Sequence, residues 1–171
     1  RLEKGAVLVK IIAAGICGTD RHMLEGRVAV HFPIIPGHEN VGIIEEIGGQ
    51  VCLTDVEGHP LQVGDLITWD SGFYSCGECY YCRWLPSNYG LVFCEKGRSY
   101  GFENCETPPH LLGGWAEYIY LFPGTWIYKV PANLSPEQAV LVDVLASVNG
   151  VERAVFHSAW LNVGLGLGQT A

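Results

Sequence analysis

The alternation of apolar and polar positions predicts short β-strands in the first part of the chain. Residues 7–14 (VLVKIIAA) are mostly apolar and run into a glycine, which is typical of a buried strand. Residues 41–47 (VGIIEEI) predict a second strand, which two glycines close. Residues 61–69 predict a third, although a Gly-Asp pair at 64–65 interrupts it as a turn or bulge would.

Two further apolar stretches flank a Pro-Gly turn signal. Residues 115–122 and 126–130 predict a pair of strands joined by the turn at Pro123 and Gly124. Several short strands between glycine-rich loops indicate a mainly β fold, either a small antiparallel barrel or a sandwich.

The pattern becomes helical at Ser135. Ser135 can cap a helix, Pro136 suits its first position, and Gln138 completes a capping box. Residues 137–155 (EQAVLVDVLASVNGVERAV) are largely apolar, so we expect a buried helix that leaves the β domain. Gly150 is expected to end or bend this helix.

Composition narrows the class of protein. With 171 residues, of which 49% are hydrophobic and 16% charged, the chain can bury a core and is not expected to be disordered. A net charge of −8 with scattered cations argues against nucleic acid as a partner. Apolar runs fall short of the roughly 20 residues that span a bilayer, and no signal peptide is visible, so no membrane association is expected.

Four of the seven cysteines lie in the stretch SCGECYYCRWLPSNYGLVFC, at 75–94. Steps of two intervening residues let thiolates converge on one ion, and four sulfurs fill the tetrahedral shell that zinc prefers. An iron–sulfur cluster also takes four cysteines, and disulfides or free thiols are further alternatives. The spacing and the odd cysteine count favour metal binding in the reducing cytoplasm over a disulfide scaffold. We therefore expect a closed structural zinc site made by Cys76, Cys79, Cys82 and Cys94.

Two other stretches each place one metal-competent side chain beside glycines at the end of a predicted strand. They are GICGTDRH, with Cys17, and PGHENVGIIEEIG, with His38. Taken alone, a cysteine after a strand is most often a small buried hydrophobe, and a histidine there is most often a hydrogen-bonded loop residue.

The motifs taken together resemble a known family. GxCGTD is followed by GHExxGxxxxxG, by VGD at 63–65, by the cysteine lobe and by GGWAEY at 113–118. This order resembles the zinc-dependent medium-chain alcohol dehydrogenases, especially their sorbitol and threonine dehydrogenase branches. The resemblance covers residues 5–150 and implies a GroES-like catalytic domain, an irregular β-barrel with a few helices and a zinc lobe.

The resemblance implies a second, catalytic zinc. Cys17 and His38 match its first two ligands, and Asp143 in LVDVLA falls on the position of the third. There, Asp replaces the Glu or Cys of the family, and Val144 replaces a proline. A carboxylate at this point either faces solvent or, if buried, needs a partner such as a metal. Glu39 matches the carboxylate that the family keeps beside the metal, so whether Asp143 or Glu39 is the third ligand stays open.

Three residues near Cys17 match supporting roles. Asp20 is expected to accept a hydrogen bond from a ligand and fix its orientation. Thr19 and His22 match the hydroxyl and imidazole of the family's proton relay, which carries the proton of the alcohol to solvent. For His22 the alternative is an ordinary surface histidine.

The activity implied by the resemblance is that of an alcohol or polyol dehydrogenase. The alcohol would bind at the open position of the catalytic zinc, and hydride would pass from its carbon to NAD or NADP. The resemblance also implies two zinc ions per chain and a dimeric or tetrameric full-length protein. A non-enzymatic zinc-binding module, or an inactive fragment, is the alternative.

We expect two regions along the chain. The catalytic domain covers 1–148, with its zinc lobe at about 75–105, and 149–171 hold a linker helix and the remnant of a nucleotide-binding domain. The run VGLGLGQTA gives GxGxG where a dinucleotide fold has GxGxxG. Because the chain starts at Arg1 and ends just after this run, we expect a fragment truncated before or within a Rossmann domain, inactive alone. The loop WLPSNYG is longer than usual, and Cys52 and Cys105 are expected to be free thiols.

Overall fold

The computed structural model describes residues 1–84 and 93–156, with side chains up to residue 149. The chain forms two compact units, Arg1–Val140 and Leu141–Ala171. The expected division after residue 148 stays a prediction. Most of the expected long loop before Cys94, and the glycine-rich run at 163–171, lie outside the described residues.

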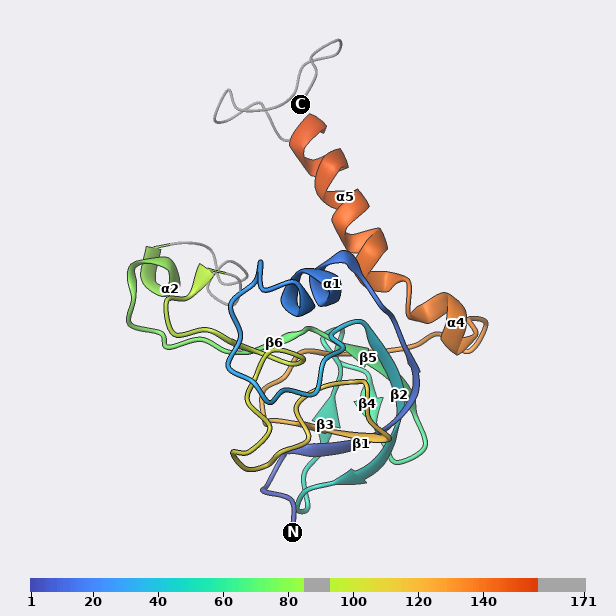
Figure 1. The fold of residues 1–171 in the computed structure, drawn as a ribbon. Helices are drawn as coiled ribbons and strands as arrows, with labels where there is room; N and C mark the ends of the chain where they lie inside the picture. Colours follow the sequence, from blue (N-terminus) through green and yellow to red (C-terminus); the bar gives the residue numbers. More distant parts are fainter. Residues whose placement is uncertain (85–92, 157–171) are drawn as a thin grey trace. The chain divides into compact units, whose positions relative to one another are not determined.

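A five-stranded antiparallel sheet is the centre of the first unit (Figure 1). Its order is β8-β1-β2-β5-β9, and β1 pairs with β2 from Val7 against Ile47 to Ala14 against Asn40. The strands predicted at 7–14 and 41–47 are confirmed, and the Gly-Asp pair separates β4 from β5 as predicted. The strands of the sheet are β1 (Val7–Ala14), β2 (Asn40–Ile47), β5 (Leu66–Trp69), β8 (Tyr118–Leu121) and β9 (Ile127–Lys129).

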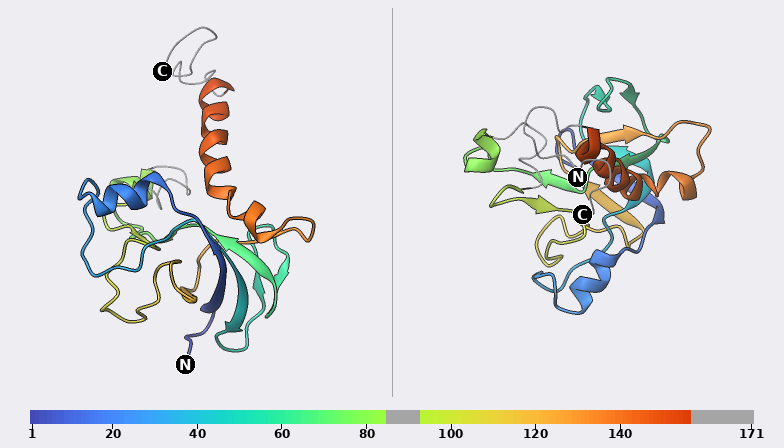
Figure 2. Two further views of the ribbon diagram at one scale, coloured as in Figure 1. Left: turned by 45° about the vertical axis from the view of Figure 1, so that its right-hand side comes forward. Right: turned by 90° about the horizontal axis from the view of Figure 1, so that it is seen from above.

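The predicted pairing of 115–122 with 126–130 is wrong. The tight turn between them does form, since the N–H of Thr125 donates to the carbonyl of Phe122 at 3.2 Å. However, β8 pairs with β1 and β9 pairs with β5, so the two strands lie at opposite edges of the sheet. Each thereby satisfies the free N–H and C=O groups of a strand that would otherwise be an open edge. A short turn between two opposite edges requires the sheet to curl, as Figure 2 shows.

Shorter elements extend this mainly β fold. The pairs β3 (Leu53–Thr54) with β4 (Pro60–Leu61), and β6 (Gly72–Tyr74) with β7 (Arg98–Ser99), are each antiparallel. Two short helices carry candidate ligands or their neighbours: α1 (Gly18–Leu24) follows β1, and α2 (Tyr80–Trp84) follows β6.

The core is built from alternate positions of the curled sheet. Val7 and Val9 of β1 are buried together with Ile119 and Leu121 of β8, as expected when every second residue points to one face. Tyr100 is fully buried among them. Its hydroxyl lies 2.8 Å from Oγ1 of Thr125 and accepts the N–H of Phe122 at 2.8 Å. These bonds brace the turn between the two edges, and burial raises the pKa of Tyr100 above its ordinary value.

The C-terminal helical region differs from its prediction in three ways. The capping box at Ser135 forms as expected, but it begins a short helix, α4 (Pro136–Ala139). A separate helix, α5 (Val142–Phe156), follows and continues through Gly150 without ending there. Its described side chains, residues 142–149, are exposed rather than buried. No helix of the described residues is long and apolar enough to cross a membrane.

Removing packing volume from the core should destabilise the fold. Ile119 is completely buried, so we expect Ile119→Ala to lower the free energy of unfolding by about 2–5 kcal/mol. Urea unfolding followed by tryptophan fluorescence measures this. Ile12→Ala is the matched control, because Ile12 is 43% exposed, and it should cost about 0.5 kcal/mol or less. Equal losses in the two variants would contradict the assignment of the core.

Candidate metal centres

Cys17 lies where β1 gives way to α1, and it caps that helix. Its Sγ accepts the N–H of Thr19 at 3.2 Å, while its own N–H donates to Oδ2 of Asp20 at 2.9 Å. These reciprocal bonds form a capping box, with cysteine in the place usually taken by serine or threonine. The cap fixes the direction of the thiol at the first turn of α1.

His38 lies just before β2, and the pairing of β1 with β2 brings it to Cys17. Beyond the last pair of the ladder, the N–H of Gly15 donates to the carbonyl of Glu39 at 2.7 Å. Sγ of Cys17 and Nε2 of His38 are consequently 3.2 Å apart. The structure therefore brings together the two side chains that the sequence singled out, with the atoms through which each would bind a metal facing one another.

Asp20 connects the two candidate ligands. It is 2% exposed, and its second oxygen, Oδ1, lies 3.6 Å from Nδ1 of His38. Neither of these two buried atoms has a hydrogen-bond partner among the described residues. A small closure would let Nδ1–H donate to Asp20 and leave Nε2 free to bind a cation, which is the usual arrangement behind a metal-bound histidine. The residues present thus fit a metal ion at Cys17 and His38.

Two carboxylates were predicted as a third ligand. A carboxylate oxygen of Glu39, the Cys17 sulfur and a ring nitrogen of His38 all lie within 4.8 Å of one another. Asp143 lies in α5, in the second unit, and is exposed. The structure places Glu39 beside the first two ligands, and the choice between Glu39 and Asp143 stays a prediction.

The predicted proton-relay residues share one helix. Thr19 and His22 stand three positions apart on α1, which is the spacing of neighbours on a helix surface. The His22 side chain is 46% exposed, and its Nδ1 lies 3.9 Å from Oε2 of Glu25. This imidazole is therefore half open to solvent, as both the relay and the surface alternative require.

The four clustered cysteines form a second, separate group. Sγ of Cys82 lies 3.5 Å from that of Cys79 and 3.9 Å from that of Cys76, and all four sulfurs lie within 4.8 Å of one another. Sulfurs about 2.3 Å from a central zinc would be about 3.8 Å apart at the corners of a tetrahedron, whereas a disulfide needs about 2.05 Å. Cys76 follows β6 and Cys94 precedes β7, so this pair of strands closes the lobe at its base. Cys52 and Cys105 are free, as expected.

The surroundings of the lobe shift the pKa values of two neighbouring thiols in opposite directions. Hydrogen bonds from the N–H groups of Cys82 and Glu95 lower the pKa of Cys79 to about 6. In contrast, burial raises the pKa of Cys82 to about 12. Without a metal, the lobe therefore holds a thiolate beside a thiol at neutral pH.

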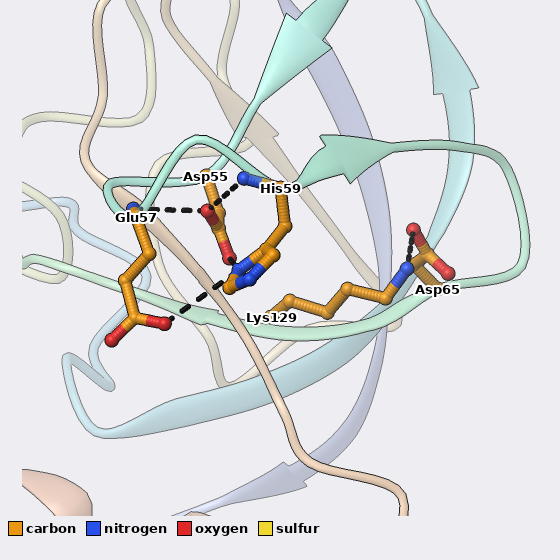
Figure 3. A network of polar contacts seen from close by, with 5 residues as sticks. All are labelled: Asp55, Glu57, His59, Asp65 and Lys129. Atoms are coloured by element: carbon orange, nitrogen blue, oxygen red, sulfur yellow. Dashed lines mark hydrogen bonds and ion pairs between the residues drawn. The ribbon is translucent and has the colours of Figure 1, made fainter.

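Asp55, Glu57 and His59 form a third group of potential metal ligands, which the sequence did not indicate (Figure 3). Their closeness results from hydrogen bonds within the turn between β3 and β4. Asp55 lies between β3 and β4, and its Oδ1 accepts the N–H groups of Glu57 at 2.9 Å and His59 at 2.8 Å. Its Oδ2 lies 3.2 Å from Nδ1 of His59. Burial opposes ionisation of Asp55, but these bonds outweigh it and hold its pKa below the ordinary value. The group thus stabilises the hairpin through its own contacts.

Two features that hold His38 were not predicted as such. The GGWAEY segment runs against the His38 loop, where Gly114 N–H donates to the carbonyl of Gly37 at 2.9 Å. A Cβ on Gly114 would overlap the side chain of Asn40, so only glycine fits there. The adjacent glycines Gly113 and Gly114 could have indicated that the backbone of this segment lies close to another part of the chain. The ring of Phe102, 5.2 Å from that of His38 between centroids, lies in a stretch that carried no such signal.

Comparison with known proteins agrees with this geometry. Residues 3–132 match the alcohol dehydrogenase GroES-like domain. The chain is 37% identical over 141 residues to an alcohol dehydrogenase of Geobacillus stearothermophilus. It is 34% identical over 154 residues to D-arabinitol dehydrogenase 1 of Uromyces fabae. These matches cover 81% and 89% of the chain but 36% and 38% of the relatives, so the chain spans less than half of their length.

Solved structures lead to the same family. An alcohol dehydrogenase from Thermotoga maritima superposes with a TM-score of 0.74 at 34% identity, over 94% of this chain and 42% of that one. A protein from Sinorhizobium meliloti, described as a zinc-binding dehydrogenase and bound to NADP, superposes with a TM-score of 0.72 at 29% identity. That match covers 91% of this chain and 40% of the other. The chain belongs to the zinc-dependent medium-chain alcohol dehydrogenase family.

Replacing Asp20 by asparagine should weaken metal binding at Cys17 and His38. The amide keeps an oxygen for the Cys17 N–H, but it turns an NH₂ group toward His38 instead of an acceptor. We expect about 10- to 100-fold lower affinity, measured by competition with a chromophoric chelator. Asp65→Asn is the control, since that carboxylate pairs with Lys129 on the sheet. Unchanged affinity in Asp20→Asn would show that Asp20 does not orient the ligand.

The shifted thiol pKa values predict unequal reactivity in the metal-free lobe. At pH 7, Cys79 is above its pKa and mostly thiolate, while Cys82 is far below its pKa and mostly thiol. Because the thiolate is the nucleophile, iodoacetamide should modify Cys79 first, and lowering the pH to 5 should slow that reaction. Mass spectrometry of quenched samples measures both rates, with exposed Cys52 reporting on the reagent. Equal rates at Cys79 and Cys82 would refute this order, and added zinc should protect both.

Proposed function

We propose that the chain is the catalytic domain of a zinc-dependent alcohol or polyol dehydrogenase, which moves hydride from an alcohol to NAD or NADP. The observation that carries the proposal is the approach of Cys17 Sγ to His38 Nε2 at 3.2 Å, backed by buried Asp20. This pair belongs to a different ligand group from the four thiols of the lobe. We therefore propose that the four-thiol lobe is a closed zinc site that stabilises the fold, and that the Cys17–His38 site is an open one that binds the substrate.

The two sites differ in the number of donors that the chain supplies. Four thiols complete a tetrahedral shell and leave no position for a substrate. Cys17, His38 and one carboxylate supply three donors, which leaves one position for an alcohol. Zinc held there would act as a Lewis acid on the alcohol oxygen and lower its pKa. A nicotinamide would accept the hydride, and this cofactor would bind to the part of the protein that the matched relatives have beyond this chain.

The chain's own residues would manage the proton that the alcohol loses. We assign Thr19 and His22 to this path, because they occupy one face of α1 directly after Cys17. The imidazole of His22 is half exposed, so a proton that it carries can pass directly to water, which a proton on a fully buried group could not do.

The third donor is assigned to Asp143, with Glu39 as the alternative. Glu39 is 9% exposed, and one of its carboxylate oxygens lies within 4.8 Å of the donor atoms of Cys17 and His38, which supports it as the alternative. Paired variants separate the two, since Asp143→Asn should weaken metal binding if Asp143 is a ligand, and Glu39→Gln should do so if Glu39 is.

The relatives support the proposed substrate class and cofactor. An alcohol dehydrogenase and a D-arabinitol dehydrogenase both match the chain, which supports an alcohol or polyol. The protein from Sinorhizobium meliloti was solved with NADP, which supports a nicotinamide cofactor. We also propose that the full-length protein forms a homo-oligomer, as the resemblance to the family implies.

Counting metal ions tests the proposal directly. Protein loaded with zinc and desalted should contain two zinc ions per chain by atomic emission. Cys17→Ser should contain one, because it removes a donor from the open site alone. Cys105→Ser is the matched control and should keep two, since Cys105 belongs to neither group. A single ion in the unaltered chain that Cys17→Ser does not remove would instead indicate a zinc-binding module without a catalytic site.

A further inference from the structure

Trp115 joins the two loops that carry Cys17 and His38. Its indole Nε1–H donates to the carbonyl of Gly15 at 3.1 Å, across 100 positions of sequence. Its backbone N–H donates to the carbonyl of Pro36 at 2.9 Å. Its ring lies against Gly37, where a Cβ would overlap Cδ1 of the indole. One side chain from the GGWAEY segment therefore contacts backbone two residues before Cys17 and one residue before His38.

The contacts of Trp115 lie just beyond the end of the β1–β2 ladder, where strand pairing no longer fixes the backbone of the two loops. The β1–β2 ladder ends at the pair Ala14 and Asn40, and one backbone bond, from Gly15 N–H to Glu39, continues it. Next to Cys17, Ile16 is 78% exposed, so little of its side chain is available to anchor this loop to the core. The capping box holds Cys17 relative to α1, but it does not hold α1 relative to the His38 loop. The indole hydrogen bond to the Gly15 carbonyl adds to the Gly15–Glu39 bond and ties the loop before Cys17 to the loop of His38.

We infer that Trp115 is a positioning residue for the Cys17–His38 site, an inference that rests on the proposed function of that site. The indole hydrogen bond sets the orientation of the peptide after Gly15, and the ring supports Gly37 in its left-handed conformation, φ +94°. Together they hold the 3.2 Å approach of sulfur to nitrogen before a metal arrives. Such preorganisation raises metal affinity because the ion does not have to order the loops itself.

Other bonds keep the His38 loop folded when the indole is altered. The Gly37 carbonyl accepts both the Gly114 N–H at 2.9 Å and Nδ2 of Asn40 at 3.1 Å. The Pro36 bond uses the backbone of Trp115 and survives any side-chain change. Trp115→Phe therefore removes the donor to Gly15 and keeps an aromatic ring on Gly37, whereas Trp115→Leu removes both.

The test compares metal affinity at the two sites in Trp115→Phe, Trp115→Leu and the unaltered chain. Cobalt(II) reports on each site through its visible absorption, and competition with a chelator gives zinc affinities. We expect about tenfold weaker binding at the Cys17–His38 site in Trp115→Phe, a larger loss in Trp115→Leu, and no change at the four-thiol lobe. Tyr128→Phe is the control, because Tyr128 is a 39% exposed aromatic side chain on β9 and belongs to neither ligand group, and it should change neither affinity.

The urea midpoint of the metal-free proteins separates positioning from folding. A positioning role predicts that Trp115→Phe unfolds at the same urea concentration as the unaltered chain while binding zinc more weakly. Unchanged affinity in both Trp115 variants overturns the inference and leaves the proposed function intact. A fall in urea midpoint that accounts for the whole loss of affinity also overturns it. If the unaltered chain binds no ion that Cys17→Ser removes, both the proposed function and the inference fail.

Discussion

The antiparallel pairing of β1 with β2 is the constraint on which the rest of the structure depends. It joins the strand that leads into Cys17 to the strand that follows His38. The register of this pairing therefore determines how close the side chains of Cys17 and His38 lie to one another. A slip of one residue would turn the apolar positions of β1 away from the core, which is why burial enforces the register so strongly. The hydrophobic core therefore specifies a polar site at its edge without contributing an atom to it.

The two ligand groups are built by different means, and this difference agrees with the tasks proposed for them. The cysteine lobe is local: its four thiols come from one stretch of sequence, and a two-stranded pair closes it. The Cys17–His38 group is assembled from two strands, a helix cap and the GGWAEY segment. A local site can order its own loop when an ion binds. A site that must present an open position to a substrate needs its ligands held by the fold beforehand.

The sequence predicted the strands because their signals are local, whereas the pairing of Cys17 with His38 was implied only by the resemblance to a known family. Residues 7–14 and 41–47 carry the apolar pattern of strands, and Cys17 and His38 follow or precede them beside glycines. The pairing of β8 with β1 and of β9 with β5 was not predicted. The Pro123-Gly124 signal shows that the chain turns there, but it does not show which other strands have unpaired edges. Asp20 was expected to fix a ligand, but its bridge between Cys17 and His38 depends on tertiary placement. The role of Phe102 could not be predicted, since it arises entirely from packing.

The position of β8 at the free edge of β1 also has a kinetic consequence. The hydroxyl of Tyr120 in β8 reaches Glu3 across 117 positions of sequence, so this edge closes late in synthesis and at a high entropic cost. Until β8 arrives, β1 presents unpaired N–H and C=O groups and an apolar face to other molecules. A nascent or truncated chain that stops before Tyr118 is therefore an aggregation-prone species with a half-built sheet. The GGWAEY segment, whose last residue Tyr118 begins β8, thus couples completion of this edge of the sheet to completion of the candidate metal site.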